Sequence, residues 1–446
     1  MFIRRDASTR LTPKSNPTDT TAARVTGTTG RRLDAFRTAV QPAKKLELQP
    51  LRDLLPQKLG EARERAAAIS EANELLLGAK LNRAETDLTI TRDAPNVNDK
   101  MDTDETSERH IAADAQVQAN AELETKLLED LTPAEREQYL SVKDACLDAN
   151  DPVAALALQK MLFEGKLPGA EDLAGEGTTL DHLATLADPN TPLAEGVDRA
   201  ELVTDLVQEL ATPSAVNQMG KGTCAPTAVA IQLASQHPAE YARIVAGLAS
   251  PEGTVVLAGG QTMKREPGTA RDDGTGRSQV QQLMAPAFME MANGDGSYTN
   301  STDAGAGAWA NTLDELYEQV MGRPMSEHTY GSDATPEEQA EAMEIMDDVL
   351  RAGGMVPMAI EYGGGLHKIL VTGTTTIDGQ EYVTYTNPWG REERMLRSEF
   401  EGRVVDISYD PTKEVIGDLK EIFGGLGGKK GLERDAERGR GRAIAV

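Results

Sequence analysis

Cysteine and aromatic residues are scarce in this chain of 446 residues, which has two cysteines and 4% aromatic residues. Two cysteines cannot build a disulfide framework, which favours folding in a reducing compartment. There is no run of 18 or more apolar residues, so we expect no membrane span. The first residues, MFIRRDASTR, lack the apolar segment of a secretory signal peptide behind them. We therefore expect a cytoplasmic protein, or one exported without such a signal.

Basic residues are also few outside the two ends of the chain. The formal net charge is −26, yet residues 1–45 hold ten Lys and Arg against three Asp and Glu. Residues 429–442 hold six against three. The strongly acidic part between these ends argues against nucleic acid as a partner of the folded body. We interpret the basic ends as solvated tails.

Composition and periodicity divide the chain into six segments. Capping-box patterns at Thr132 and Thr335 mark two helix starts, and the polar stretch APNVNDKMDTDETSERH indicates a linker. The segments are a disordered basic tail (1–45), a helical segment (46–92), a linker (93–118), a helical region (119–195), a domain with helices first and strands last (196–412), and a Gly-rich basic tail (413–446).

The stretch NQMGKGTCAPTAVA carries the first chemical signal. Gln218 precedes Cys224 by six residues, and an apolar helix is expected to begin at Cys224 with Thr223 as its N-cap. The unpaired N–H groups of a helix N-terminus favour a thiolate, which is the nucleophilic form of cysteine. Gly220 and Gly222 are expected to let the backbone turn tightly before the helix.

A histidine and an asparagine follow on two predicted strands. His367 begins the alternating stretch HKILVTGT, Asp378-Gly379 is a hairpin signal, and QEYVTYTNP returns with Asn387. This hairpin is expected to place Asn387 beside His367. An imidazole near Cys224 would lower the pKa of the thiol further.

The order Gln218, Cys224, His367 and Asn387-Pro-Trp-Gly resembles the papain-like cysteine peptidases, and its NPWG form is most similar to the calpain branch. The resemblance implies an α+β fold for residues 196–412, with a helical lobe, an antiparallel sheet lobe and a cleft between them, after a mostly helical N-terminal region. It implies that Cys224 is the nucleophile, His367 the base, Asn387 its orienting partner and Gln218 an oxyanion donor. Trp389 would cover the His–Asn pair, and Lys368 departs from the small or apolar residue common after the histidine.

The resulting hypothesis is a cysteine endopeptidase that acts on proteins or peptides through a thioester. One alternative is an acyltransferase or deamidase of the same fold, acting as a bacterial effector toxin. Another is a non-catalytic peptide-binding module. The region 119–195 would then be either a pro-segment that inhibits the active site or a docking domain.

Cofactor and metal signals are weak. The stretch NGDGSYTNSTD has alternating oxygen ligands but lacks the closing Glu of an EF-hand loop. The likeness to calpains raises calcium regulation, which the residues do not require, and we expect no cofactor. The other four histidines, His110, His182, His237 and His328, show no metal-ligand spacing, and Cys146 is expected to be a buried bystander.

Overall fold

The computed structural model describes residues 48–77, 103–294, 298, 307–308 and 312–413. The chain divides into two compact units, residues 1–60 and 61–446. The expected tail 1–45, nearly all of the tail 413–446 and residues 78–102 lie outside the described part. The packing described below concerns the second unit, in which an α+β fold is confirmed.

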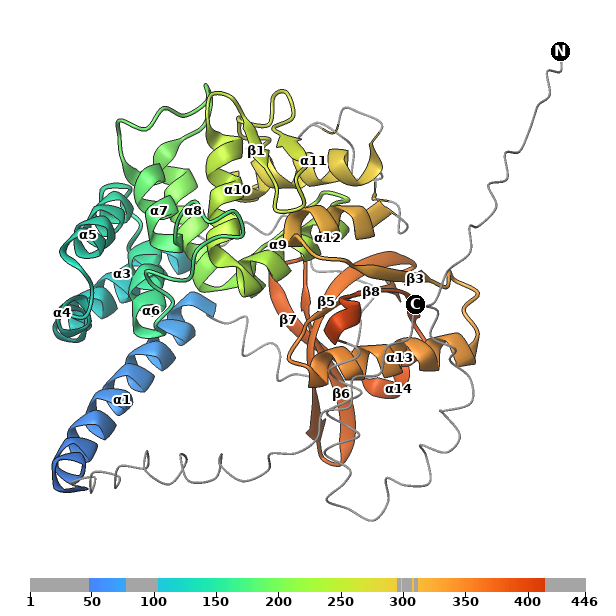
Figure 1. Cartoon of the computed structure of the whole chain (residues 1–446), viewed down its shortest axis with the longest axis horizontal. Coiled ribbons are helices and arrows are strands. Elements are labelled where there is room, and N and C mark those ends of the chain that lie inside the picture. Colours follow the sequence, from blue (N-terminus) through green and yellow to red (C-terminus); the bar gives the residue numbers. More distant parts are fainter. Residues whose placement is uncertain (1–47, 78–102, 295–297, 299–306, 309–311, 414–446) are drawn as a thin grey trace, which may run out of the picture. The chain divides into compact units, whose positions relative to one another are not determined.

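Helices occupy the first part of that unit (Figure 1), and with one short hairpin they form what we call the helical region. Helix α1 runs from Leu48 to Leu77 and so begins in the first unit. The other elements are α3 (Thr103–Ala119), α4 (Ala121–Leu128), α5 (Pro133–Asp148), α6 (Pro152–Phe163), α7 (Thr179–Ala187), α8 (Arg199–Ala211), the 3-10 turn η1 (Pro213–Ala215), α9 (Cys224–Gln236), α10 (Pro238–Ala249), β1 (Thr254–Val256), β2 (Thr262–Lys264), α11 (Gln279–Asn293) and α12 (Leu313–Met321).

The predicted linker 93–118 is wrong over its second half, because α3 occupies residues 103–119. Ala113 and Val117, four residues apart, are buried on one face of this helix. Arg109 donates from the same helix to the carbonyls of Leu75 and Leu76, at 3.1 and 2.7 Å. These are terminal carbonyls of α1 that lack intrahelical partners. Tertiary packing therefore makes a helix of a segment whose composition reads as linker.

The expected boundary near residue 195 does not coincide with a break in packing. A single hydrophobic core includes residues on both sides of it, and α6 packs against α8. The side chain of Lys160 in α6 donates to the carbonyl of Ala211 at 2.6 Å, and Gln208 donates to Asp151 at 3.0 Å. The helices of 119–195 are thus part of the same core as those that follow.

The second part of the unit is an antiparallel sheet with two helices, which we call the sheet region. Its strand order is β3-β8-β4-β5-β6-β7, and its core is separate from that of the helical region. The elements are β3 (Ser326–Thr329), α13 (Pro336–Arg351), β4 (Val356–Tyr362), β5 (Gly365–Ile377), β6 (Gln380–Asn387), β7 (Arg391–Leu396), α14 (Arg397–Glu401) and β8 (Val404–Tyr409).

Local signals explain the borders of these elements. Thr132 and Thr335 form the predicted capping boxes of α5 and α13. Asp378 and Gly379 both have positive φ, 50° and 77°, as the predicted tight hairpin between β5 and β6 requires.

None of the described helices combines the length and apolar character that a membrane crossing needs.

Helix α9 joins the two regions. Its residues Ala225 to Ala234 are all buried, which confirms the expectation of a helix that is apolar nearly all round. It packs against α10 and α11 on one side and against β5 on the other. Ile231 of α9 forms a small core with Val216 and with Leu370 of β5. This contact packs the middle of α9 against the middle of β5.

Candidate active site

Cys224 is the first residue of α9 and is only partly exposed. As the first helical residue it carries a backbone N–H without an intrahelical acceptor. Thr223 holds the N-cap position but makes no capping hydrogen bond, and its buried hydroxyl has no partner in the described part of the chain. The cap prediction is wrong because the backbone of Thr223, with φ −110° and ψ 29°, leaves the extended conformation in which such side chains reach back.

The surroundings of Cys224 favour the thiolate. Burial by itself raises the pKa of the thiol, but a hydrogen bond and the positive charge of His367 lower it. Backbone N–H groups of Lys368 and Ala225 lower it further, so the net pKa of Cys224 lies below its ordinary value. The second of these donors belongs to the first turn of α9, where free N–H groups stabilise negative charge.

His367 lies on β5 and Asn387 ends β6, and the structure brings His367 to Cys224 and Asn387 to His367. His367 Nε2 lies 2.8 Å from Asn387 Oδ1, and both residues are buried. Burial by itself lowers the pKa of His367, whereas the thiol of Cys224, the hydrogen bond to Asn387 and the negative charge of Glu393 raise it. The net pKa of the imidazole is raised, so a thiolate–imidazolium pair is favoured at this site.

Trp389 covers the imidazole. Its ring stacks on His367 with 4.6 Å between centroids and 30° between planes. Tyr362 of β4 approaches both rings, with centroids 5.5 Å from His367 and 5.3 Å from Trp389. The two rings lie over the buried imidazole, which agrees with the cover that the resemblance implied for Trp389.

Gln218 is buried in the loop before α9. Its Nε2 donates to the carbonyl of Lys221 at 2.6 Å, while its Oε1 is buried without a partner in the described part of the chain. The amide carries a second N–H. The backbone N–H of Gln218 donates to the carbonyl of Pro388 at 2.8 Å, and Asn217 forms a β-bridge with Trp389. The Gln218 loop and the Asn-Pro-Trp-Gly turn are therefore tied together.

The chain makes the expected tight turn before α9, with Gly220 in a turn and Gly222 in a bend. Neither glycine has a positive φ, and the left-handed residue of the turn is Met219, with φ 52°. Its N–H donates to Asn217 Oδ1 at 2.8 Å, a local bond that stabilises such a turn. The glycine that the site requires is Gly390, with φ 71°, where a Cβ would lie 2.9 Å from the carbonyl oxygen of Ala215.

Glu393 of β7 was not predicted as a site residue, although it contacts Asn387 directly. Asn387 Nδ2 donates to Glu393 Oε1 at 3.1 Å. A signal for it exists in the sequence. The tight Pro-Trp-Gly turn places Asn387 opposite Arg391 and Tyr385 opposite Glu393, so these alternate residues share one face of the hairpin.

Lys368, the residue that departs from the family pattern, is buried beside the site. Its ammonium group is paired with Asp406 of β8 and donates to the Ser408 hydroxyl at 2.9 Å. Glu327 of β3 lies 3.8 Å away. The positive charge of Lys368 is thus neutralised within the sheet region by Asp406. The contact of Lys368 with Cys224 is made by its backbone N–H.

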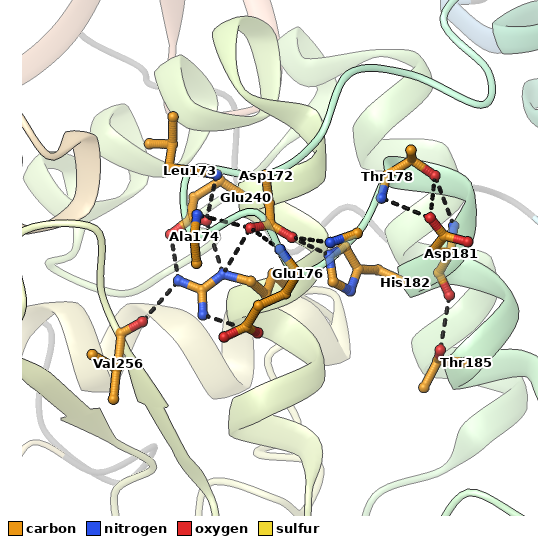
Figure 2. A network of polar contacts seen from close by, with 12 residues as sticks. Asp172, Leu173, Ala174, Glu176, Thr178, Asp181, His182, Thr185, Glu240 and Val256 are labelled. Atoms are coloured by element: carbon orange, nitrogen blue, oxygen red, sulfur yellow. Dashed lines mark hydrogen bonds and ion pairs between the residues drawn. The ribbon is translucent and has the colours of Figure 1, made fainter.

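Two other histidines, His182 and His328, lie in structural surroundings. Figure 2 shows a polar network around Asp172, whose Oδ2 lies 2.8 Å from His182 Nε2 and accepts from the Gly177 N–H. His328 contacts the Tyr330 and Tyr409 rings. In the described residues no cluster of three or more His, Cys, Asp or Glu side chains suits a metal ion. The stretch NGDGSYTNSTD, residues 293–303, lies mostly outside the described residues.

Cys146 is fully buried in α5, as expected. Burial, followed by the negative charge of Asp151, raises the pKa of its thiol to about 12. The two cysteines therefore differ in the direction of their pKa shifts. Of the two, only Cys224 has the lowered pKa that favours the nucleophilic thiolate.

A scan against protein-family models and a search of curated proteins found no match to this chain.

Proposed function

We propose that this protein is a cysteine endopeptidase whose residues 196–412 adopt the two-lobed papain-like arrangement. One observation carries the proposal. A cysteine at a helix N-terminus is hydrogen-bonded to a histidine whose Nε2 lies 2.8 Å from an asparagine carbonyl oxygen. The separate cores of the helical and sheet regions support two lobes. The acyl group would come from a protein or peptide.

In the first half-reaction the Cys224 thiolate attacks the peptide carbonyl carbon and a C–S bond forms. The carbonyl oxygen takes up the negative charge, which the Cys224 N–H and the second Nε2–H of Gln218 would stabilise. The His367 imidazolium gives its proton to the amide nitrogen as the C–N bond breaks. The amine leaves and a thioester remains on Cys224.

In the second half-reaction His367, now neutral, removes a proton from water as the oxygen attacks the thioester. The same donors hold the second oxyanion. The C–S bond breaks and the carboxylic acid leaves. The Cys224 thiolate and the protonated imidazole of His367 are thereby restored together. Asn387 does not touch the substrate; it keeps Nε2 of His367 engaged so that the other ring nitrogen serves Cys224.

The test is to incubate the purified chain with a protein mixture and to map newly formed N-termini by mass spectrometry. We expect new N-termini with the wild-type chain and with Cys146→Ala, and none with Cys224→Ala. A mass change of about one unit without new N-termini would instead identify a deamidase. Equal products from the wild-type chain and Cys224→Ala would contradict the proposal.

A further inference from the structure

Glu393 lies at the centre of a buried polar cluster behind the His367–Asn387 pair. Its carboxylate accepts from Asn387 Nδ2 at 3.1 Å and from the Tyr385 hydroxyl at 3.0 Å. The Tyr362 hydroxyl lies 3.4 Å away, and the guanidinium group of Arg391 is paired with it. These partners come from three strands, β4, β6 and β7, so a carboxylate 4% exposed has donors on several sides.

The cluster fixes which way the Asn387 amide points. A carboxylate can only accept hydrogen bonds, so the atom that faces Glu393 must be the NH₂ group. The opposite amide atom also accepts from the Trp389 N–H at 3.2 Å, which only an oxygen can do. The oxygen therefore faces His367 Nε2, which must carry a hydrogen. The remaining ring nitrogen, Nδ1, is left to exchange the proton with Cys224.

We propose that Glu393 is a positioning residue of this site, which locks the Asn387 amide and places a negative charge behind the imidazolium. The proposal rests on the proposed function and adds a fourth member to its Cys224–His367–Asn387 arrangement. Removing the charge should weaken the thiolate–imidazolium pair without removing any group that touches the substrate. The charged and titratable groups that bear on Glu393 are Arg391, Tyr385, Tyr362 and His367.

Glu393→Gln in the full chain is the central variant, because its shape is conserved. A cavity of about 440 Å³ borders Glu393 and Tyr385, and truncation to alanine would enlarge it. Glu392→Gln is the matched control, since Glu392 is the exposed neighbour on the same strand. The primary measurement is the rate of Cys224 alkylation by iodoacetamide against pH, which needs no substrate. The pH profile of peptide-cleavage kcat/KM is the second.

In Glu393→Gln the pKa of the imidazolium should fall and that of the thiol should rise. Both limits of the active pH range should move inward, by roughly half a unit to one unit each. Peptide kcat should fall about ten- to a hundredfold with KM little changed. Glu392→Gln should match the wild-type chain. Arg391→Gln, which leaves the Glu393 charge uncompensated, should move the basic limit upward instead.

Wild-type pH limits in both Glu393→Gln and Arg391→Gln would overturn the proposal. If Glu393→Gln fails to fold, the upward shift in Arg391→Gln decides the matter, and its absence likewise overturns the proposal. If Cys224 of the wild-type chain is alkylated with the pH profile of an ordinary thiol, the proposed function itself fails. If that profile is depressed but unaffected by the variants, only the role of Glu393 fails.

Discussion

The helical region and the sheet region each hold a histidine against a side-chain oxygen with the same geometry. His182 Nε2 lies 2.8 Å from Asp172 Oδ2, and His367 Nε2 lies 2.8 Å from Asn387 Oδ1. The partner of His182 is directly charged, whereas that of His367 is a neutral amide with a carboxylate behind it. The first pair therefore has the charged acceptor, yet only the second has a thiol beside it.

The difference lies in what else each acceptor does. Asp172 accepts from the backbone N–H groups of Ala174, Glu176 and Gly177, and it is 3.7 Å from the guanidinium of Arg243 (Figure 2). Its carboxylate holds a loop in place. Asn387 instead orients a ring that faces the N-terminus of a helix. A histidine with a partner is thus common to both regions, and the position of α9 makes one of them a candidate active site.

His367→Ala should give the largest effect on activity and separate the two histidines. We expect peptide turnover to fall by about 10²–10⁴-fold or more, since His367 is the group proposed to shuttle the proton. Because the imidazolium lowers the pKa of Cys224, its loss should raise that pKa. Alkylation by iodoacetamide near pH 6 should then be lost and return as the pH rises.

His182→Ala is the control for that experiment. Both its turnover and the pH profile of Cys224 alkylation should match the wild-type chain. If the two histidine variants behave alike, the distinction between the regions is wrong.

The sequence was sufficient to predict the four candidate site residues that have a motif around them. Gln218, Cys224, His367 and Asn387 were predicted from order and local context, and the structure brings the cysteine, histidine and asparagine together. Their catalytic roles stay a prediction. Glu393 was missed because a glutamate in a charged stretch, REER, carries no signal until the hairpin register is drawn.

The helical region was harder to predict because its packing is not local. Whether residues 103–119 are linker or helix depends on Ala113 and Val117 finding a core. Whether residues 119–195 are separable depends on contacts such as Lys160 to Ala211, which are distant in sequence. Capping boxes give helix starts reliably, but they do not indicate which helices share a core. The shared core is evidence against a pro-segment that detaches as a unit.

Gln218→Ala should have a smaller effect on activity than His367→Ala, and it tests the oxyanion donor separately from the proton shuttle. An oxyanion donor acts mainly in the transition state, so kcat should fall about 10²–10³-fold with KM little changed. The pH profile of Cys224 alkylation should stay as in the wild-type chain, because that reaction forms no oxyanion on a carbonyl. Full peptide activity in Gln218→Ala would remove this residue from the site.

Asp172→Asn should have the smallest effect on activity and its main effect on stability. The amide cannot replace the acceptor capacity of a buried carboxylate that holds three N–H groups and His182, so the free energy of unfolding should fall by about 1–3 kcal/mol. Peptide kcat/KM of the folded variant should match the wild-type value. Glu176→Gln is the control, because the side chain of Glu176 is 62% exposed and its ion pair with Arg243 contributes little.

The pH dependence of that loss follows from the Asp172 pKa. Burial opposes ionisation, but the hydrogen bonds from His182 and from the Glu176 and Ala174 N–H groups outweigh it, and the pKa is lowered. A carboxyl with a lowered folded-state pKa contributes stability that is complete above its unfolded-state pKa and is lost as the pH falls through the folded-state pKa. Denaturant unfolding at a series of pH values should therefore show the full difference between the wild-type chain and Asp172→Asn at neutral pH. The difference should shrink only in acid, below about pH 4. A difference that persists unchanged in acid, or a fall in kcat/KM at neutral pH, would show that the Asp172 network does more than hold its loop.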